Sequence, residues 1–404
     1  MPTFNYKARA DSGKPLRGVM EAVSKDEVAE KLRKMGYAPV KITKVIAGLK
    51  LEQLGQGLRR ISNEDIVMFI VQLANMINSG LSIMSSLDIL EKQIENKKLK
   101  EVIGSVSRSV EGGMSFSEAL TGHPGVFSHL FVSMVRAGEA SGNLDKVLSR
   151  YAEFAEGQAD LQQKVKGALF YPALLITAAT LVIVFIVSFI IPRFVEIFNK
   201  AGIILPLPTV ILYRVGLVIR HFWYLIILAC ALVVWAIKRY IRGERGKLNF
   251  DRFSLKLPVI GSLIRRTCIS RFARTLSTLI GSGVPILESL DIVRQVVNNE
   301  VLGRVIGQMR RSAEKGEKLG EALKVSEEFP ADTVQMISVG EETGNLEGML
   351  NKISDFYERA IGYSIKKLTT VLEPAFLVIM GAVVAFIMAS MLLPMFDMMK
   401  LLRG

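Results

Sequence analysis

The sequence predicts an all-α membrane protein with two repeated cytosolic bundles of about six helices, three transmembrane helices and a small α+β module at the amino terminus. Two observations predict this fold class. A long stretch of the chain recurs further on, and each copy runs into an apolar segment long enough to cross a bilayer. Hydrophobic residues make up 50% of the 404, which suits a chain that is partly soluble and partly embedded in a membrane.

Residues 1–45 predict a small ββαβ-like module. The stretches FNYKA and GVMEAV alternate between apolar and polar residues as short strands do. Ser24 begins a helix that ends near Gly36, and a third strand follows. Residues 46–61 contain Gly48, Gly55 and Gly57 and are expected to form a linker.

The two repeats are expected at residues 62–167 and 265–373. The matching stretches are Asn78–Leu90 with Gly281–Val293, and Val135–Leu148 with Ser338–Leu350. Apolar residues recur at intervals of three, four and seven in both copies, which indicates amphipathic helices. Ser62 and Ser115 each stand three residues before an acidic residue and resemble capping boxes. We therefore expect each copy to be a compact helical bundle with short turns.

Glycines at equivalent positions of the two copies are expected to end helices or to let helices pack closely. The structural set is Gly80, Gly138, Gly142, Gly283, Gly340 and Gly344. Within the recurring GExxGNL motif, Asn143 and Asn345 directly follow a glycine stop and suit the N-cap of the next helix.

Three apolar segments predict transmembrane helices. They span residues 168–192, 216–237 and 374–396. The second segment includes Arg220 and His221 near one end, from where both side chains can reach the membrane interface.

Basic residues predict the orientation of the spans. Two lysines precede the first span, five basic residues follow the second within a connector at 238–264, and two lysines precede the third. By the positive-inside rule, both repeats and the amino terminus lie in the cytosol. The loop at 193–215 and the tail at 397–404 then lie outside.

The net charge of +13 is explained by the same inner-face bias, so no nucleic-acid partner is expected. The first residues carry no apolar run. We therefore expect no cleaved signal peptide.

Signatures of catalysis are missing from the sequence. No GxxxxGK[ST] phosphate loop occurs, and the three histidines lack metal-ligand spacing. Cys230 lies in an apolar segment and Cys268 in a basic soluble one, so no disulfide is expected. We expect a protein that is not an enzyme and that uses neither metal nor cofactor.

Four prolines bracket the first and third spans. They are Pro172, Pro192, Pro374 and Pro394. Matched kinks in the two spans are one interpretation. The favoured one is a first-turn proline and an exit proline for each span, because helices tolerate proline there. Glu373, at the mouth of the third span, either binds a basic partner or, as we favour, sits among the lipid headgroups.

Several motifs together resemble a known family. They are the double GExxGNL, the SGL and SGVP turns, LPLPT at Leu205–Thr209, KLPVIGSL at Lys256–Leu263 and LEPAFLVIMG at Leu372–Gly381. With the opening FNYKARADSGKPLRGVMEA, they make essentially the whole chain similar to the inner-membrane platform family (PilC/GspF) of type IV pilus and type II secretion machines. The departures, before Phe127 and at Lys318 where the serine cap is missing, concern loops.

The resemblance implies a non-enzymatic scaffold in the bacterial inner membrane, with its amino terminus in the cytosol and its carboxyl terminus in the periplasm. As a type IV pilus platform it would couple a hexameric assembly ATPase, and a retraction ATPase in machines that retract, to the insertion or extraction of pilin subunits. It would also contact other inner-membrane components of the machine and the lipid bilayer. A homo-oligomer is expected, with a dimer favoured.

Candidate partner contacts are Glu139, Glu341, Asn143, Asn345 and Glu373. For the two GExxGNL glutamates, the favoured alternative is a solvated charge at a helix end. The junctions Lys164–Pro172 and Lys366–Pro374 lack a glycine-rich hinge, so motion of each bundle is expected to reach its span.

Three alternatives remain at the level of sequence. The platform of a type II secretion system belongs to the same family and is barely separable from a pilus platform. A signalling receptor would need a sizeable external domain, whereas the outer loop here is short. A transporter is disfavoured because the spans carry no charged residue in their interiors.

Overall fold

The computed structural model describes residues 3–10, 15–22, 24–45, 60–200, 205–258 and 260–403. Most of the expected linker at 46–61 lies outside these residues. The chain divides into two compact units. One holds residues 1–66 with 87–108, and the other holds residues 67–86 with 109–404.

The amino-terminal module is a three-stranded antiparallel sheet with one helix. Its elements are β1 (Thr3–Ala10), β2 (Pro15–Glu21), α1 (Lys25–Lys34) and β3 (Tyr37–Val45), and the strand order is β2-β1-β3. Alternate residues of the central strand, Phe4 and Ala8, pack in one buried cluster with Val28 and Leu32 of α1. The Ser24 hydroxyl accepts a hydrogen bond from the Glu27 amide at 3.2 Å and so begins α1. The predicted ββαβ order is confirmed.

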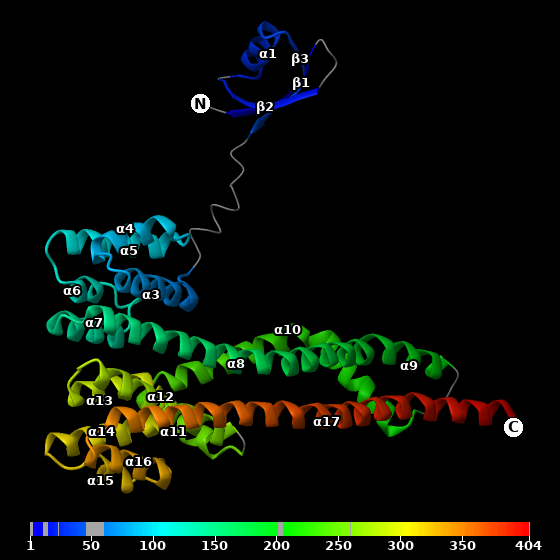
Figure 1. The fold of residues 1–404 in the computed structure, drawn as a ribbon. Coiled ribbons are helices and arrows are strands. Elements are labelled where there is room, and N and C mark those ends of the chain that lie inside the picture. The colour runs from blue at the N-terminus through cyan, green and yellow to red at the C-terminus, as the bar shows by residue number, and fades with distance from the viewer. Residues whose placement is uncertain are drawn as a thin grey trace. The chain divides into compact units, whose positions relative to one another are not determined.

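The two repeats contain the same six helices in the same order (Figure 1). Repeat one comprises α3 (Asn63–Asn78), α4 (Ile83–Gln93), α5 (Lys97–Glu111), α6 (Phe116–Thr121), α7 (His129–Ser141) and α8 (Leu144–Phe185). Repeat two comprises α12 (Ile260–Gly281), α13 (Ile286–Val296), α14 (Glu300–Glu314), α15 (Leu319–Lys324), α16 (Ala331–Glu342) and α17 (Leu346–Arg403). The predicted internal repeat of helical domains is confirmed.

Local sequence explains where these helices begin and end. Ser62 with Asp65, and Ser115 with Glu118, each form both hydrogen bonds of a capping box. The stop glycines adopt left-handed backbone, with φ of +87° at Gly80 and +83° at Gly283, and of +69° at both Gly142 and Gly344. A side chain would be strained at each of these φ values, which is why the turns need glycine.

The two GExxGNL asparagines differ in what they bind. Asn345 accepts a hydrogen bond from the Gly348 amide at 3.1 Å and caps α17. Asn143 occupies the equivalent N-cap position of α8 but makes no side-chain cap bond. Its amide instead donates to the Ser141 carbonyl at 3.0 Å. The expected N-cap bond therefore forms in the second copy and not in the first.

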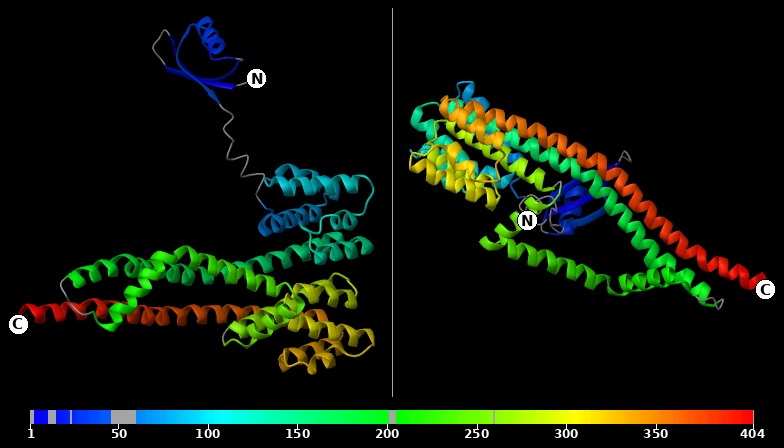
Figure 2. Two further views of the ribbon diagram at one scale, coloured as in Figure 1. Left: turned by 180° about the vertical axis from the view of Figure 1, so that it is seen from behind. Right: turned by 90° about the horizontal axis from the view of Figure 1, so that it is seen from below.

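The last helix of each repeat runs on without a break into a candidate membrane span. The segment from Leu144 to Lys200 consists of α8, a five-residue π-helix η1 (Ile186–Ile190) and α9 (Ile191–Lys200), and α17 alone has 58 residues. With α10 (Leu207–Ile241), these give three helices long and apolar enough to cross a membrane, as predicted. Both views of Figure 2 show α8 and α17 lying side by side.

The favoured interpretation of the span prolines is wrong. Pro172, Pro374 and Pro394 lie inside helices, and Pro192 is the second residue of α9. Neither α8 nor α17 begins at the membrane, so neither has a first turn there to hold a proline. At Pro192, η1 precedes the proline directly, and such a π-helical turn accommodates the missing amide hydrogen bond.

The three spans meet at the end that is distant from the repeats. Val187, Ile191 and Val195 of the first span form a buried cluster with Ile387 of α17, against which side chains of α10 pack. Beyond a kink at Phe222, where φ is −115° and ψ is 19°, residues 223–240 of α10 are exposed on every side.

The connector predicted at 238–264 contains a further helix, α11 (Glu244–Lys256). Its Asp251 carboxylate accepts a hydrogen bond from the Glu300 amide at 2.7 Å, at the N-terminus of α14. This contact attaches the connector to the second repeat.

Candidate functional site

The two GExxGNL glutamates cap a short helix in their own repeat. The Glu139 carboxylate accepts hydrogen bonds from the Phe116 amide at 2.6 Å and the Ser117 amide at 3.1 Å, the first two of α6. Glu341 does the same for α15, accepting from the Leu319 amide at 2.9 Å and the Gly320 amide at 3.3 Å. A carboxylate at a helix N-terminus satisfies otherwise unpaired amides and opposes the helix dipole.

The structure gives both glutamates a role within their own repeat. Each carboxylate is half-buried and accepts two backbone hydrogen bonds, so it is not a freely solvated charge. A contact of either residue with a partner stays a prediction. The missing serine cap at Lys318 was the available signal, because an uncapped helix requires an acceptor from elsewhere in the fold.

The glycine before each of these glutamates allows two helices to approach closely. A Cβ atom on Gly138 would stand 3.1 Å from the Val147 Cβ, and one on Gly340 would stand 3.0 Å from the Met349 Cβ. These contacts join α7 to α8 and α16 to α17. Each GExxGNL motif thus attaches its bundle to the helix that enters the membrane.

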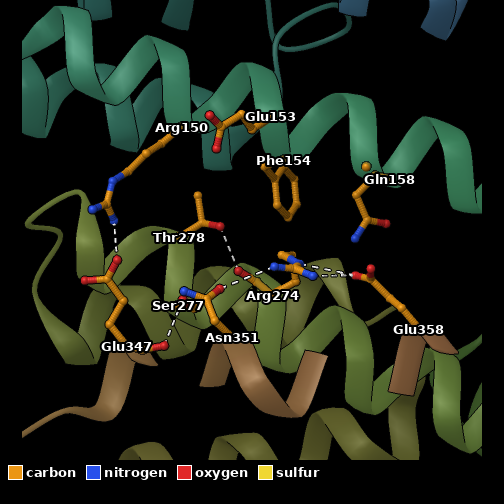
Figure 3. Close-up of a pocket in the computed structure, with 11 residues that line it drawn as sticks. Arg150, Glu153, Phe154, Gln158, Arg274, Ser277, Thr278, Glu347, Asn351 and Glu358 are labelled. Carbon is orange, nitrogen blue, oxygen red and sulfur yellow. Dashed lines mark hydrogen bonds and ion pairs between the residues drawn. The ribbon is translucent and has the colours of Figure 1, made fainter. Parts of the chain in front are cut away.

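A polar pocket of about 460 Å³ lies where α8 of the first repeat faces α12 and α17 of the second (Figure 3). Across this inter-repeat pocket, Arg150 Nη1 on α8 contacts Glu347 Oε1 on α17 at 2.6 Å. This ion pair links the two repeats directly.

A second ion-pair group on the same pocket belongs to repeat two. Arg274 on α12 contacts Asp355 at 2.5 Å and Glu358 at 3.0 Å, both on α17, and donates to the Asn351 side-chain oxygen Oδ1 at 3.4 Å. Partial burial opposes the charge of Arg274, but hydrogen bonds and attraction from Asp355 and Glu358 outweigh it and raise the pKa of the guanidinium. Arg274 therefore stays charged and holds α12 to α17.

Gly281 makes room for the ion pair between the repeats. A Cβ atom there would lie 1.6 Å from Arg150 Nη1. The equivalent residue in the first repeat is Asn78, whose amide donates to Ser149 within the same repeat at 2.6 Å. Sequence reasoning missed this site. The available signal was the exchange of asparagine for glycine inside an otherwise matching motif.

A groove of about 690 Å³ also lies between the repeats. It is lined by the turn Ser141–Asn143 of the first repeat and by the turn Gly281–Pro285 of the second. Arg136 and Lys146 also line it. Of the sequence-predicted contact residues, Asn143 lies in this groove, whereas Asn345 lines neither the groove nor the inter-repeat pocket.

Glu373 lies at the membrane end of the α8–α17 pair. It is exposed on α17 and borders a shallow apolar depression with Tyr171 and Pro172 of α8. Tyr171 is the first-repeat counterpart of Glu373, so equivalent positions of the two copies border one depression.

The described residues offer no obvious site for a metal. They contain no group of three His, Cys, Asp or Glu side chains that could hold an ion. Cys230 is exposed on α10 and Cys268 is buried in α12. Burial raises the pKa of the Cys268 thiol to about 11, so the group is protonated at neutral pH and is a poor nucleophile.

Comparison with known protein families decides the relationship. Residues 69–192 and 272–394 each match the family described as type II secretion system protein F, and residues 1–43 match its N-terminal domain. The chain belongs to this family. Each of the two larger matches covers most of a repeat together with its candidate span.

Relatives from two kinds of machine align along almost the whole chain. The type IV pilus assembly protein PilC of Thermus thermophilus is 37% identical over 403 residues, covering 98% of both chains. PilC of Myxococcus xanthus is 35% identical, covering 98% of this chain and 94% of its own. The type II secretion system protein F of Xanthomonas campestris is 34% identical, covering 98% and 99%. The resemblance stated from sequence motifs is confirmed.

Proposed function

We propose that this chain is the inner-membrane platform of a type IV pilus machine and that it couples a cytosolic motor ATPase to the insertion or extraction of pilin subunits. The pilus relatives, similar over their whole length, support the choice of machine. The observation that carries the coupling is the continuity of α8 and α17 from the bundles into the spans. No chemistry is required of the platform itself, which acts as a scaffold.

In this proposal both repeats and the amino-terminal module lie in the cytosol. Lysines stand just before the first and third spans, and five basic residues follow the second. The segment around Lys200 and the end of α17 then face the periplasm. The apolar surface of the three helices contacts lipid and the other membrane components of the machine.

A motor acting on the bundles would move the two long helices together. An α-helix is stiff along its axis. The Arg150–Glu347 pair joins α8 to α17, and the buried cluster around Val187 and Ile387 joins η1 and α9, which continue α8, to α17 again. Because the two long helices are joined at both ends, they should move as one rigid body and transmit a displacement of the bundles to the spans. The spans could then lift a pilin or withdraw it.

The surface offered to the motor is best sought in the groove between the repeats. The glutamates of both GExxGNL motifs already cap helices, whereas Asn143, Arg136 and Lys146 line a groove on the bundles. A second copy of the chain could occupy the same groove, in keeping with the homo-oligomer that we expect.

The transmission can be tested by making the third-span junction flexible. A Gly/Ser segment of about ten residues inserted after Lys367 interrupts α17 between its bundle and its span. The variant should insert in the membrane and co-purify with the motor ATPase, yet assemble no filaments. The matched control inserts a helix-forming segment of eleven residues, which extends α17 by three turns and should retain more filaments. Normal filament assembly by the flexible variant would show that this junction transmits no motion.

A second candidate is the platform of a type II secretion system, which the 34% identical relative favours. Deleting the gene separates the two functions. Loss of surface filaments supports the pilus platform, and loss of exoprotein secretion with filaments retained supports the secretion platform.

A further inference from the structure

We propose that the groove between α8 and α17 at their entry into the membrane binds the phosphate headgroup of an anionic phospholipid. This entry groove has a volume of about 480 Å³ and is lined by Lys164, Gly167 and Tyr171 of α8, and by Gly362, Lys366 and Thr369 of α17. The inference rests on the membrane placement in the proposed function, and it requires neither the motor nor the filament.

The groove follows from the internal repeat. Lys164 and Lys366 are equivalent positions in the two copies, and both stand shortly before the apolar span of their helix. Because α8 and α17 lie side by side and enter the membrane in the same direction, the two lysines arrive on one groove. On each helix the lining residues recur at intervals of three, four and seven, so each helix contributes one face.

The groove stays open because two of its positions are glycine. A Cβ atom on Gly167 or on Gly362 would find nothing within 4 Å. Glycine weakens a helix interior relative to alanine, and at these positions neither backbone strain nor a close neighbour requires it. Its effect here is to leave space between two helices at the depth of the lipid headgroups.

The charges around the groove favour a phosphodiester. Lys164 lies just outside the hydrocarbon, about 6 Å along the helix from the start of the predicted span at Ala168. That position is within the headgroup layer. Basic pockets between transmembrane helices on the cytoplasmic side suit anionic headgroups, and the Tyr171 hydroxyl supplies a further hydrogen-bond donor.

Three nearby carboxylates limit where the phosphate can sit. Asp160 pairs with Lys164 at 2.5 Å, but this exposed pair is weak and can yield to a phosphate. Glu358, one turn before Gly362, is engaged by Arg274. Glu373 lies about 10 Å beyond Lys366 on the membrane side and repels a phosphate that would sit deeper. The headgroup is therefore held at the level of the lysines.

The acyl chains would continue along the same pair of helices. The apolar depression below the groove shares Tyr171 and Thr369 with it and is otherwise lined mainly by Leu175, Ile176 and Phe376. A lipid bound here contacts both long helices at once. It would thus add a third tie to the pair, between the Arg150–Glu347 ion pair and the cluster at the far end.

Retention of single lipids by the full-length protein tests the proposal. The protein in neutral detergent is mixed with equal amounts of phosphatidylglycerol and phosphatidylcholine, and bound lipids are counted by native mass spectrometry. Wild type should retain phosphatidylglycerol in preference. Lys164→Gln/Lys366→Gln should weaken that retention by about five-fold for each lysine lost. The matched control Lys166→Gln/Lys367→Gln removes the same charge beside the groove and should stay within two-fold of wild type.

Two further variants separate the groove from general folding effects. Gly362→Leu fills the groove while improving helix propensity, so it should lose phosphatidylglycerol without losing thermal stability. Gly157→Leu is the control, because an added Cβ atom at this helix glycine would also meet nothing within 4 Å, and this variant should still retain phosphatidylglycerol. Asp160→Asn frees Lys164 and should strengthen retention.

Three results would overturn the proposal. Equal losses in the two lysine pairs would mean diffuse attraction without a site. Unchanged retention in both Lys164→Gln/Lys366→Gln and Gly362→Leu would place the lipid elsewhere. Ile365 of α17 also lines the entry groove. If crosslinks through a cysteine at this position join two copies in a bilayer and phosphatidylglycerol does not reduce them, the groove is an interface between copies and not a lipid site.

Discussion

At the residue scale, equivalent positions of the two repeats have the same structural role only where their surroundings are the same. Glu139 and Glu341 cap equivalent helices in equivalent ways. Gly281 and Asn78 occupy equivalent positions but face different neighbours, because only Gly281 meets the other repeat. The recurring glutamates thus share a capping role, and the difference between Gly281 and Asn78 coincides with the contact between the repeats.

Glu139→Ala should destabilise the first repeat. The substitution leaves the amides of Phe116 and Ser117 without their acceptor, which should cost about 2 kcal/mol of unfolding free energy. Chemical unfolding of the full-length protein in detergent measures the loss. Glu156→Ala, at an exposed site on α8, is the control and should change the free energy by less than about 0.5 kcal/mol. Equal effects of the two substitutions would contradict the capping role.

Cys268 should make stability depend on pH in the alkaline range. Its pKa is raised by burial from 9.0 to about 11, so the folded protein holds the proton more tightly than the unfolded chain does. The resulting stability is fully present below pH 9 and is lost as the pH rises through 11, by about 2–3 kcal/mol in all. Cys268→Ala should lack this part of the pH profile. An identical profile in the variant would show that the thiol titrates normally.

At the element scale, the decisive feature is that each repeat ends in a helix longer than the bundle needs. Pro172 and Pro374 do not end α8 and α17. Packing of these two helices against each other offsets the one backbone hydrogen bond that each proline removes. At the far end, the close approach of α10 to η1 depends on Gly216, whose added Cβ atom would lie 2.2 Å from the Val187 carbonyl oxygen.

Gly216→Ala should separate the second span from the first. The clash is with backbone, which cannot rotate away as a side chain can, and overpacking of this kind costs about 1–3 kcal/mol. The measured quantity is stability in detergent. Gly381→Ala, in the third span at a position with open space, is the matched control and should be neutral or slightly stabilising. Should Gly216→Ala be as stable as the control, the spans do not meet as described.

At the scale of the whole molecule, the proposed topology has three crossings, which place both repeats on the same side of the membrane. A domain followed by one span ends on the far side, so a second copy needs a returning helix before it. The returning helix is α10, and beyond Phe222 the structure leaves it exposed on all sides. Its contacts with the other two spans lie before the kink, which suits a helix whose main task is to bring the chain back.

Reporter fusions test this arrangement. An enzyme that is active only outside the cytosol should be silent when fused after Arg245 and active when fused after Pro206, because in the proposed topology the basic flanks lie inside. The expression level of each fusion is the control. The reverse pattern would invert the topology and place both bundles in the periplasm.

The sequence by itself determined the repeat, the helices and the number of spans. These features depend on periodicity, capping residues and runs of apolar residues, all of which act over short distances along the chain. The stops at Gly80, Gly142, Gly283 and Gly344 show it well, because a left-handed turn is decided by the residue that occupies it.

Only the tertiary structure decided what these elements do for one another. Three contacts join residues that are far apart in sequence. Glu139 caps α6, Arg150 lies against Gly281, and Lys164 and Lys366 line one groove. No local pattern encodes such pairs, since each depends on which helix faces meet. Packing also allows the last helix of each repeat to continue past its prolines, at positions where local propensity predicts a helix boundary.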